Sequence, residues 1–158
     1  MSNMSEGELE FHRKTAKKCF NEAWDYLDKK SGDAQEERQM LHLAHASRYH
    51  WGLVGTPKDQ AIGDWQISRI YATLNQPNLT LHFAKSCLEA CEKNNLSDII
   101  HTACEGMARA HAIGKDYKSA REYIRKAREH FDRLTGLNEE DKKIYLHQLR
   151  ETEELISR

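Results

Sequence analysis

The sequence has few of the residues that interrupt helices. Its 158 residues include two prolines and eight glycines, and β-branched residues do not form runs. Because proline breaks a helix and glycine weakens one, their scarcity leaves room for long, uninterrupted helices. Apolar residues recur three and four positions apart, which is the spacing of one helix face. The sequence therefore predicts an all-α chain.

An excess of charge and a long apolar run are also missing. The chain has 24 basic and 25 acidic residues, a formal net charge of -1, whereas binding to nucleic acid or anionic lipid needs an excess of cations. No apolar run approaches the ~20 residues that span a bilayer, and the first residues do not resemble a signal peptide. We expect a cytoplasmic protein with no nucleic-acid and no membrane partner.

Break signals divide the chain into seven predicted helices, at about residues 8–30, 34–53, 57–75, 79–94, 98–113, 117–134 and 138–156. Thr56, Ser97 and Asn138 are the expected N-caps at three of the starts. Short connections predict antiparallel pairs within one domain. We expect a divergent first pair at 8–54, a second pair at 57–94, a third at 97–135 and a capping helix at 138–156, with 1–7 disordered.

The segment 116–127 carries the clearest repeat signal. Asp116–Ala120, followed by Ile124 and Ala127, resembles the second-helix signature of tetratricopeptide repeats. Aligning Ala84 with Ala120 gives a period of 36 residues, close to the ~34 of that family. The resemblance implies a right-handed α-α superhelix of about three antiparallel helix pairs plus the C-terminal capping helix.

A longer part of the chain is similar to a family of short, uncharacterised bacterial proteins. The similarity lies in Ala44–Trp51, Thr56-Pro57 and Gly63–Arg69. It supports the helical-repeat fold and implies no particular activity.

In a tetratricopeptide-like fold, the first helix of each pair lines a concave groove. The alignment places six residues there, namely Gln66, Arg69, Thr73, Thr102, Glu105 and Arg109. Arg69 and Glu105 are expected either to pair with each other or to contact a partner, whereas Arg109 has no evident partner in this row. The leading hypothesis is a non-catalytic module that binds an acidic or carboxylate-bearing protein or peptide. The sequence leaves a homodimer open.

A second group of candidates precedes and follows the turn at Pro57. His42, His45 and His50 lie close together on one predicted helix, and two helical histidines can bind a metal. The alternative hypothesis is a small metal-dependent or ligand-binding enzyme that uses them. The pattern offers no third ligand and no acid–base carboxylate, so we expect neither metal nor cofactor. The tryptophans nearby either form a pocket wall or fill the core, which makes the candidate pocket residues His45, Arg48, Trp51 and Trp65.

The four cysteines fall on apolar helical stripes. Cys87 and Cys91, together with His101 and Cys104, would form a zinc-binding set if two helices brought them face to face. Small buried side chains also suit close helix packing. We therefore expect four reduced, metal-free thiols.

One predicted helix concentrates basic residues, which are Lys115, Lys118, Arg121, Arg125, Lys126 and Arg128. Glu122 and Glu129 stand among them, so we interpret the run as a solvated face with pairs at i,i+4 spacing.

Overall fold

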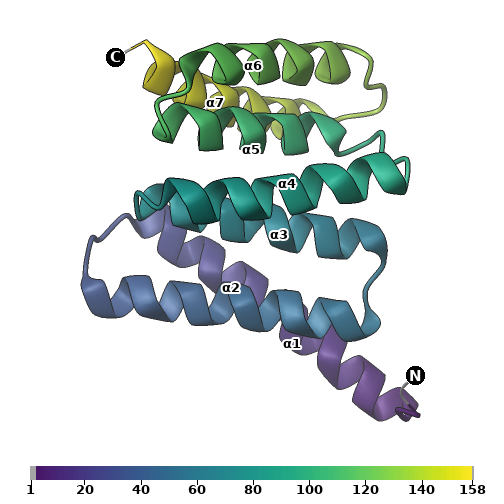
Figure 1. The fold of residues 1–158 in the computed structure, drawn as a ribbon. Coiled ribbons are helices and arrows are strands. Elements are labelled where there is room, and N and C mark those ends of the chain that lie inside the picture. The colour runs from purple at the N-terminus through teal and green to yellow at the C-terminus, as the bar shows by residue number, and fades with distance from the viewer. Residues whose placement is uncertain (1–2, 158) are drawn as a thin grey trace.

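The computed structural model describes residues 3–157 and consists of helices stacked in antiparallel pairs (Figure 1). The elements are α1 (Glu6–Lys29), α2 (Ala34–Val54), α3 (Pro57–Thr73), α4 (Pro77–Lys93), α5 (Ile100–Ile113), α6 (Tyr117–Asp132) and α7 (Glu139–Ile156). Residues 3–157 contain no strand, which confirms the all-α prediction. Within the same range, no helix has both the length and the apolar character needed to cross a bilayer.

Local capping sets most helix starts. Thr56 accepts a hydrogen bond from the Asp59 N–H, and the Asp59 side chain accepts one from the Thr56 N–H. Asn138 likewise caps α7, so both predicted N-caps are confirmed. The Ser97 prediction is wrong, because the Leu96 carbonyl accepts the Ile99 and Ile100 N–H groups in a turn and α5 begins only at Ile100.

The first helix starts earlier than the sequence suggested. Ser5 and Glu8 form a capping box, so α1 begins at Glu6, inside the segment expected to be disordered. Residues 1–2 of that segment lie outside the described residues.

The second and third pairs repeat every 40 residues. The α3–α4 turn has Asn75 at φ 55° and the α5–α6 turn has Lys115 at φ 65°. Each turn is closed by the same three backbone hydrogen bonds, donated by Leu74, Asn75 and Gln76 in one and by Gly114, Lys115 and Asp116 in the other. The helices that follow begin at positions 77 and 117.

This period corrects the 36-residue alignment. In the structure Ala120 is the counterpart of Thr80, and Ala84 is the counterpart of Ile124. Ala84 and Ala120 are both small and buried, so residue type alone does not separate the two registers. Arg69 is consequently equivalent to Arg109 rather than to Glu105.

The last helix extends over more of the stack than a simple cap. Tyr145 and Leu149 are buried in a cluster with Cys104 of α5 and Ala127 of α6. Glu151 of the same helix reaches back to Arg69 of α3. Figure 1 shows α7 behind α5 and α6, on the face toward which α1 runs. The surface that the sequence left open as a groove is therefore partly covered by α7.

Candidate functional site

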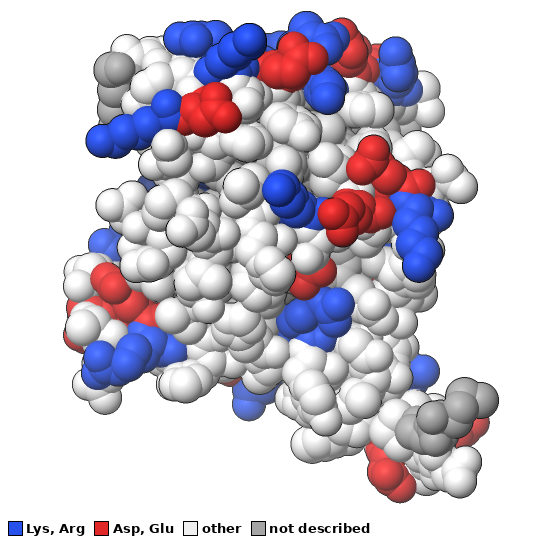
Figure 2. All heavy atoms as spheres, viewed as in Figure 1, with Lys and Arg blue, Asp and Glu red and all other residues white. Residues whose placement is uncertain are grey.

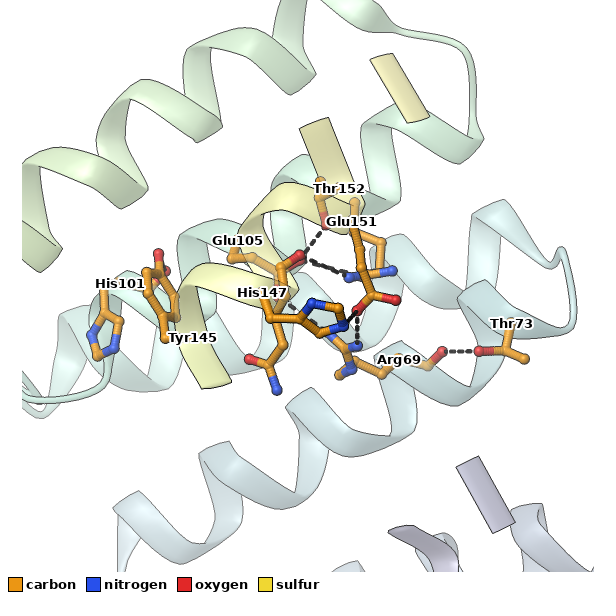
Figure 3. A network of polar contacts seen from close by, with 10 residues as sticks. Arg69, Thr73, His101, Glu105, Tyr145, His147, Glu151 and Thr152 are labelled. Carbon is orange, nitrogen blue, oxygen red and sulfur yellow. Dashed lines mark hydrogen bonds and ion pairs between the residues drawn. The ribbon is translucent and has the colours of Figure 1, made fainter. Parts of the chain in front are cut away.

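A buried carboxylate organises the covered face. Glu105 of α5 is fully buried and accepts hydrogen bonds from Arg69 Nη1 at 3.4 Å, Arg109 Nε at 3.2 Å and Thr152 Oγ1 at 2.6 Å. Figure 3 shows Arg69 of α3, Glu105 of α5 and Thr152 of α7 converging. A carboxylate without solvent needs such partners, since an unpaired buried charge is costly. The predicted pairing of Arg69 with Glu105 is confirmed.

Arg69 packs its guanidinium against two tryptophan rings. Its guanidinium carbon lies 5.7 Å from the centroid of the Trp24 ring and 5.5 Å from that of Trp65, and the two indoles stack with centroids 5.5 Å apart. Burial, and then the neighbouring Arg109 cation, lower the pKa of Arg69 to about 10. Arg69 therefore stays protonated at neutral pH, held by cation–π contacts and by Glu105.

Arg109 has two partners, one of which is a predicted groove residue. It pairs with Glu105 one helical turn away, and its Nη2 donates to the backbone carbonyl of Gln148 on α7 at 3.4 Å. The sequence-based view of Arg109 as unpartnered is wrong, because Glu105 lies one turn away on the same helix and α7 adds a second contact.

A cavity of about 630 Å³ opens beside this network. Four elements line it: α1, with the Lys30 that follows it, α3, α5 and α7. Its wall carries more cationic than acidic side chains, with Lys30, Arg69, Arg109 and Lys143 against Asp28 and Glu151. Trp24, Leu27 and Ile144 give it an apolar floor. This cavity, called the cationic cavity below, has the chemistry to hold a carboxylate attached to an apolar group.

The other three predicted groove residues lie in different surroundings. Thr73 lines the cationic cavity, although its hydroxyl donates back to the Arg69 carbonyl. Gln66 is fully buried and donates to the Phe20 carbonyl at 2.9 Å, so it fixes α1 on α3. Thr102 lines a different, smaller cavity.

The four candidate pocket residues around the Pro57 turn also make separate contacts. His45 Nε2 lies 3.0 Å from the Tyr71 hydroxyl, and Arg48 Nε donates to Asp64 at 2.9 Å. Trp51 packs next to Gly55 at the end of α2. Trp65 is buried in the core against Trp24.

The three histidines of the alternative hypothesis do not share one set of partners, since His42 is exposed and the other two have different neighbours. His45 contacts Tyr71, while His50 Nδ1 lies 2.8 Å from His12 Nδ1. Burial, and then His12, lower the pKa of His50. Within residues 3–157, no three histidine, cysteine or acidic side chains come together as a metal site would require.

The cysteine set is a packing feature in the described part of the chain. Cys87, Cys91 and Cys104 are buried free thiols in two neighbouring apolar clusters. Burial raises the pKa of Cys104 to about 12, which keeps this thiol protonated and unreactive.

Sequence reasoning missed the walls contributed by the first and last helices. Trp24 and Lys30 come from the α1 end, and Lys143, His147 and Glu151 come from α7. The spacing within each helix is visible in the sequence, but the contact between α1, α3 and α7 is not. The proximity of aromatic and basic residues at the end of α1 was the available signal.

The charged face of α6 follows the prediction. Arg125 pairs with Glu122 and Glu129 on its own helix, and Arg128 pairs with Glu153 of α7. Figure 2 shows blue and red side chains interleaved along this edge of the molecule.

Comparison with models of known protein families, with curated proteins and with solved structures finds no match for this chain.

Proposed function

We propose that this protein is a non-catalytic interaction module whose cationic cavity captures a carboxylate-bearing, acidic segment of a partner protein or peptide. The observation that carries the proposal is the cavity wall, which has an apolar floor and four cations. These outnumber the two carboxylates of the wall and the buried Glu105 that pairs with both arginines. Arginine and lysine beside apolar side chains suit a peptide carboxylate next to an apolar residue.

The proposal also covers the fold type and the cellular location, and these two parts rest on sequence resemblance. It includes a tetratricopeptide-like, right-handed superhelix and a role in the bacterial cytoplasm. The 40-residue repeat of the α3–α4 and α5–α6 pairs supports the helical-repeat part of the proposal.

Lys143 is the residue with which to test the cavity. Arg109 is tied to the buried Glu105, so replacing it would disturb folding as well as binding. Lys143 is exposed, lines the cavity and makes no ion pair with residues 3–157. Its charge can therefore be reversed with little structural cost.

The experiment uses a fluorescein-labelled, glutamate-rich hexapeptide with a free C-terminal carboxylate, titrated with the full chain by anisotropy. We expect Lys143→Glu to weaken binding about threefold to tenfold, and added salt to weaken binding to the parent protein. A hexapeptide with glutamine in place of glutamate and an amidated end should bind less well.

Lys118→Glu is the matched control, since it makes the same charge change on an exposed position of α6. If Lys143→Glu binds as the parent does while Lys118→Glu loses binding, the peptide uses the α6 face and the proposal is wrong.

A further inference from the structure

A second cavity, of about 270 Å³, lies between α3, α5 and α7 on the other side of Gln148. We call it the apolar cavity. Much of its wall consists of aliphatic and aromatic side chains, namely Ile62, Trp65, Ile99, Leu137, Ile144 and Tyr145. An apolar cavity of about 150 Å³ is large enough for benzene, so this one has room for a substituted six-membered ring.

Three side chains on its wall have polar groups that lack a protein partner among the described residues. Gln148 is 8% exposed, and its side-chain amide makes no hydrogen bond to residues 3–157. Trp65 Nε1 and His101 Nδ1 are buried without a partner in the same part of the chain, and both residues line the cavity. Buried polar groups are almost always hydrogen-bonded, and leaving one unpaired costs free energy. Two such atoms on one small cavity are therefore unusual, and the side-chain amide of Gln148 beside them also has no protein partner within the described range.

We propose that the apolar cavity binds a small, neutral, planar molecule that presents an amide or lactam edge to Gln148. A primary amide offers one donor side and one acceptor side, so it pairs with a second amide through two hydrogen bonds. The flat aliphatic and aromatic walls favour a ring attached to that edge.

The charges at the cavity select against an anion. Asp98 and Asp141 both line it, and only Asp98 has a cationic partner among the described residues, Lys58. A carboxylate ligand would meet like charge there. This chemistry is opposite to that of the cationic cavity, so the two proposals succeed or fail separately.

The test is a titration of the ¹⁵N-labelled full chain with benzamide, followed by NMR. We expect the Gln148 side-chain amide and the Trp65 indole N–H signals to shift and saturate in the millimolar range, as suits a ligand of this size. The Trp51 indole signal, from outside the cavity, should stay in place. Benzoate has nearly the same shape and should bind at least about tenfold more weakly because of its charge.

Two variants separate a binding role from a packing role. Gln148→Leu removes the amide and keeps the backbone carbonyl that Arg109 contacts, so benzamide affinity should fall about threefold to tenfold. His147→Ala changes the neighbouring residue, which lines only the cationic cavity of the two, and should leave it unchanged.

Three results would overturn the proposal. They are shifts that fail to saturate, equal binding of benzamide and benzoate, and parent-like affinity in a folded Gln148→Leu protein. Should that variant fail to fold, the parent titration alone decides, because an unshifted Trp65 signal means that only water enters the cavity.

Discussion

Glu105 is the residue on which the interior polar network depends. It is fully buried and contacts two arginines and Thr152. Glu105→Ala leaves both guanidinium groups without their shared carboxylate, and we expect it to destabilise the fold by about 3–5 kcal/mol. Urea unfolding followed by circular dichroism measures this. Glu151→Ala, at a half-buried partner of Arg69, should cost less than about 1 kcal/mol, and equal losses for the two variants would contradict the network.

His101 makes stability depend on pH. Burial, and then the nearby His130, lower the pKa of His101 to about 4, with Asp98 acting in the opposite direction. The unfolded chain takes up this proton near pH 6.5, before the folded chain does, so stability is lost as pH falls from 6.5 toward 4. The loss amounts to about 3 kcal/mol, from the 1.36 kcal/mol that each pKa unit represents.

The measurement is the free energy of unfolding from pH 7 to pH 4 for the parent and for His101→Phe. Histidines that are not coupled to His101 affect both proteins alike, so the difference between the two curves reports on His101 and its coupling to His130. Curves that stay parallel across the range would show that His101 does not titrate as described.

At the scale of the helices, the two turns of the 40-residue repeat each hold one residue in the left-handed backbone conformation, and the two residue types tolerate it differently. Lys115 at φ 65° bears a strain that asparagine, at the equivalent Asn75, tolerates better. Lys115→Gly should therefore stabilise the protein by about 1 kcal/mol, and Asn75→Gly by less. Thermal melting of both variants tests the ranking, and a larger gain at Asn75 would reverse it.

Two helix starts were predictable because their signal is local, although the equally local capping box of Ser5 and Glu8 was missed. Thr56 and Asn138 cap through residues three positions away, and such short-range chemistry is visible in the sequence. The prediction of Ser97 as an N-cap failed because the Leu96 carbonyl, in a turn, accepts the N–H groups of Ile99 and Ile100. The repeat register failed for a related reason, since two small buried alanines suited either alignment.

The candidate site was predictable only in part. Arg69 and Glu105 were paired correctly, although they meet because α3 and α5 pack side by side and not because they are repeat equivalents. Gln148 and Thr152 of α7 are buried, although polar residues are mostly exposed. They are buried because Glu105 and Arg109 bind them across 47 and 39 residues of sequence.

At the scale of the whole molecule, two side chains of α7 line both cavities. Ile144 and Gln148, one helical turn apart on α7, stand on the walls of both. If a molecule that fixes these side chains from one side changes the shape presented on the other, the two occupancies are thermodynamically linked. Reciprocity then requires the factor by which benzamide alters peptide affinity to equal the factor by which the peptide alters benzamide affinity. A single helical turn would thereby make each compartment an effector of the other.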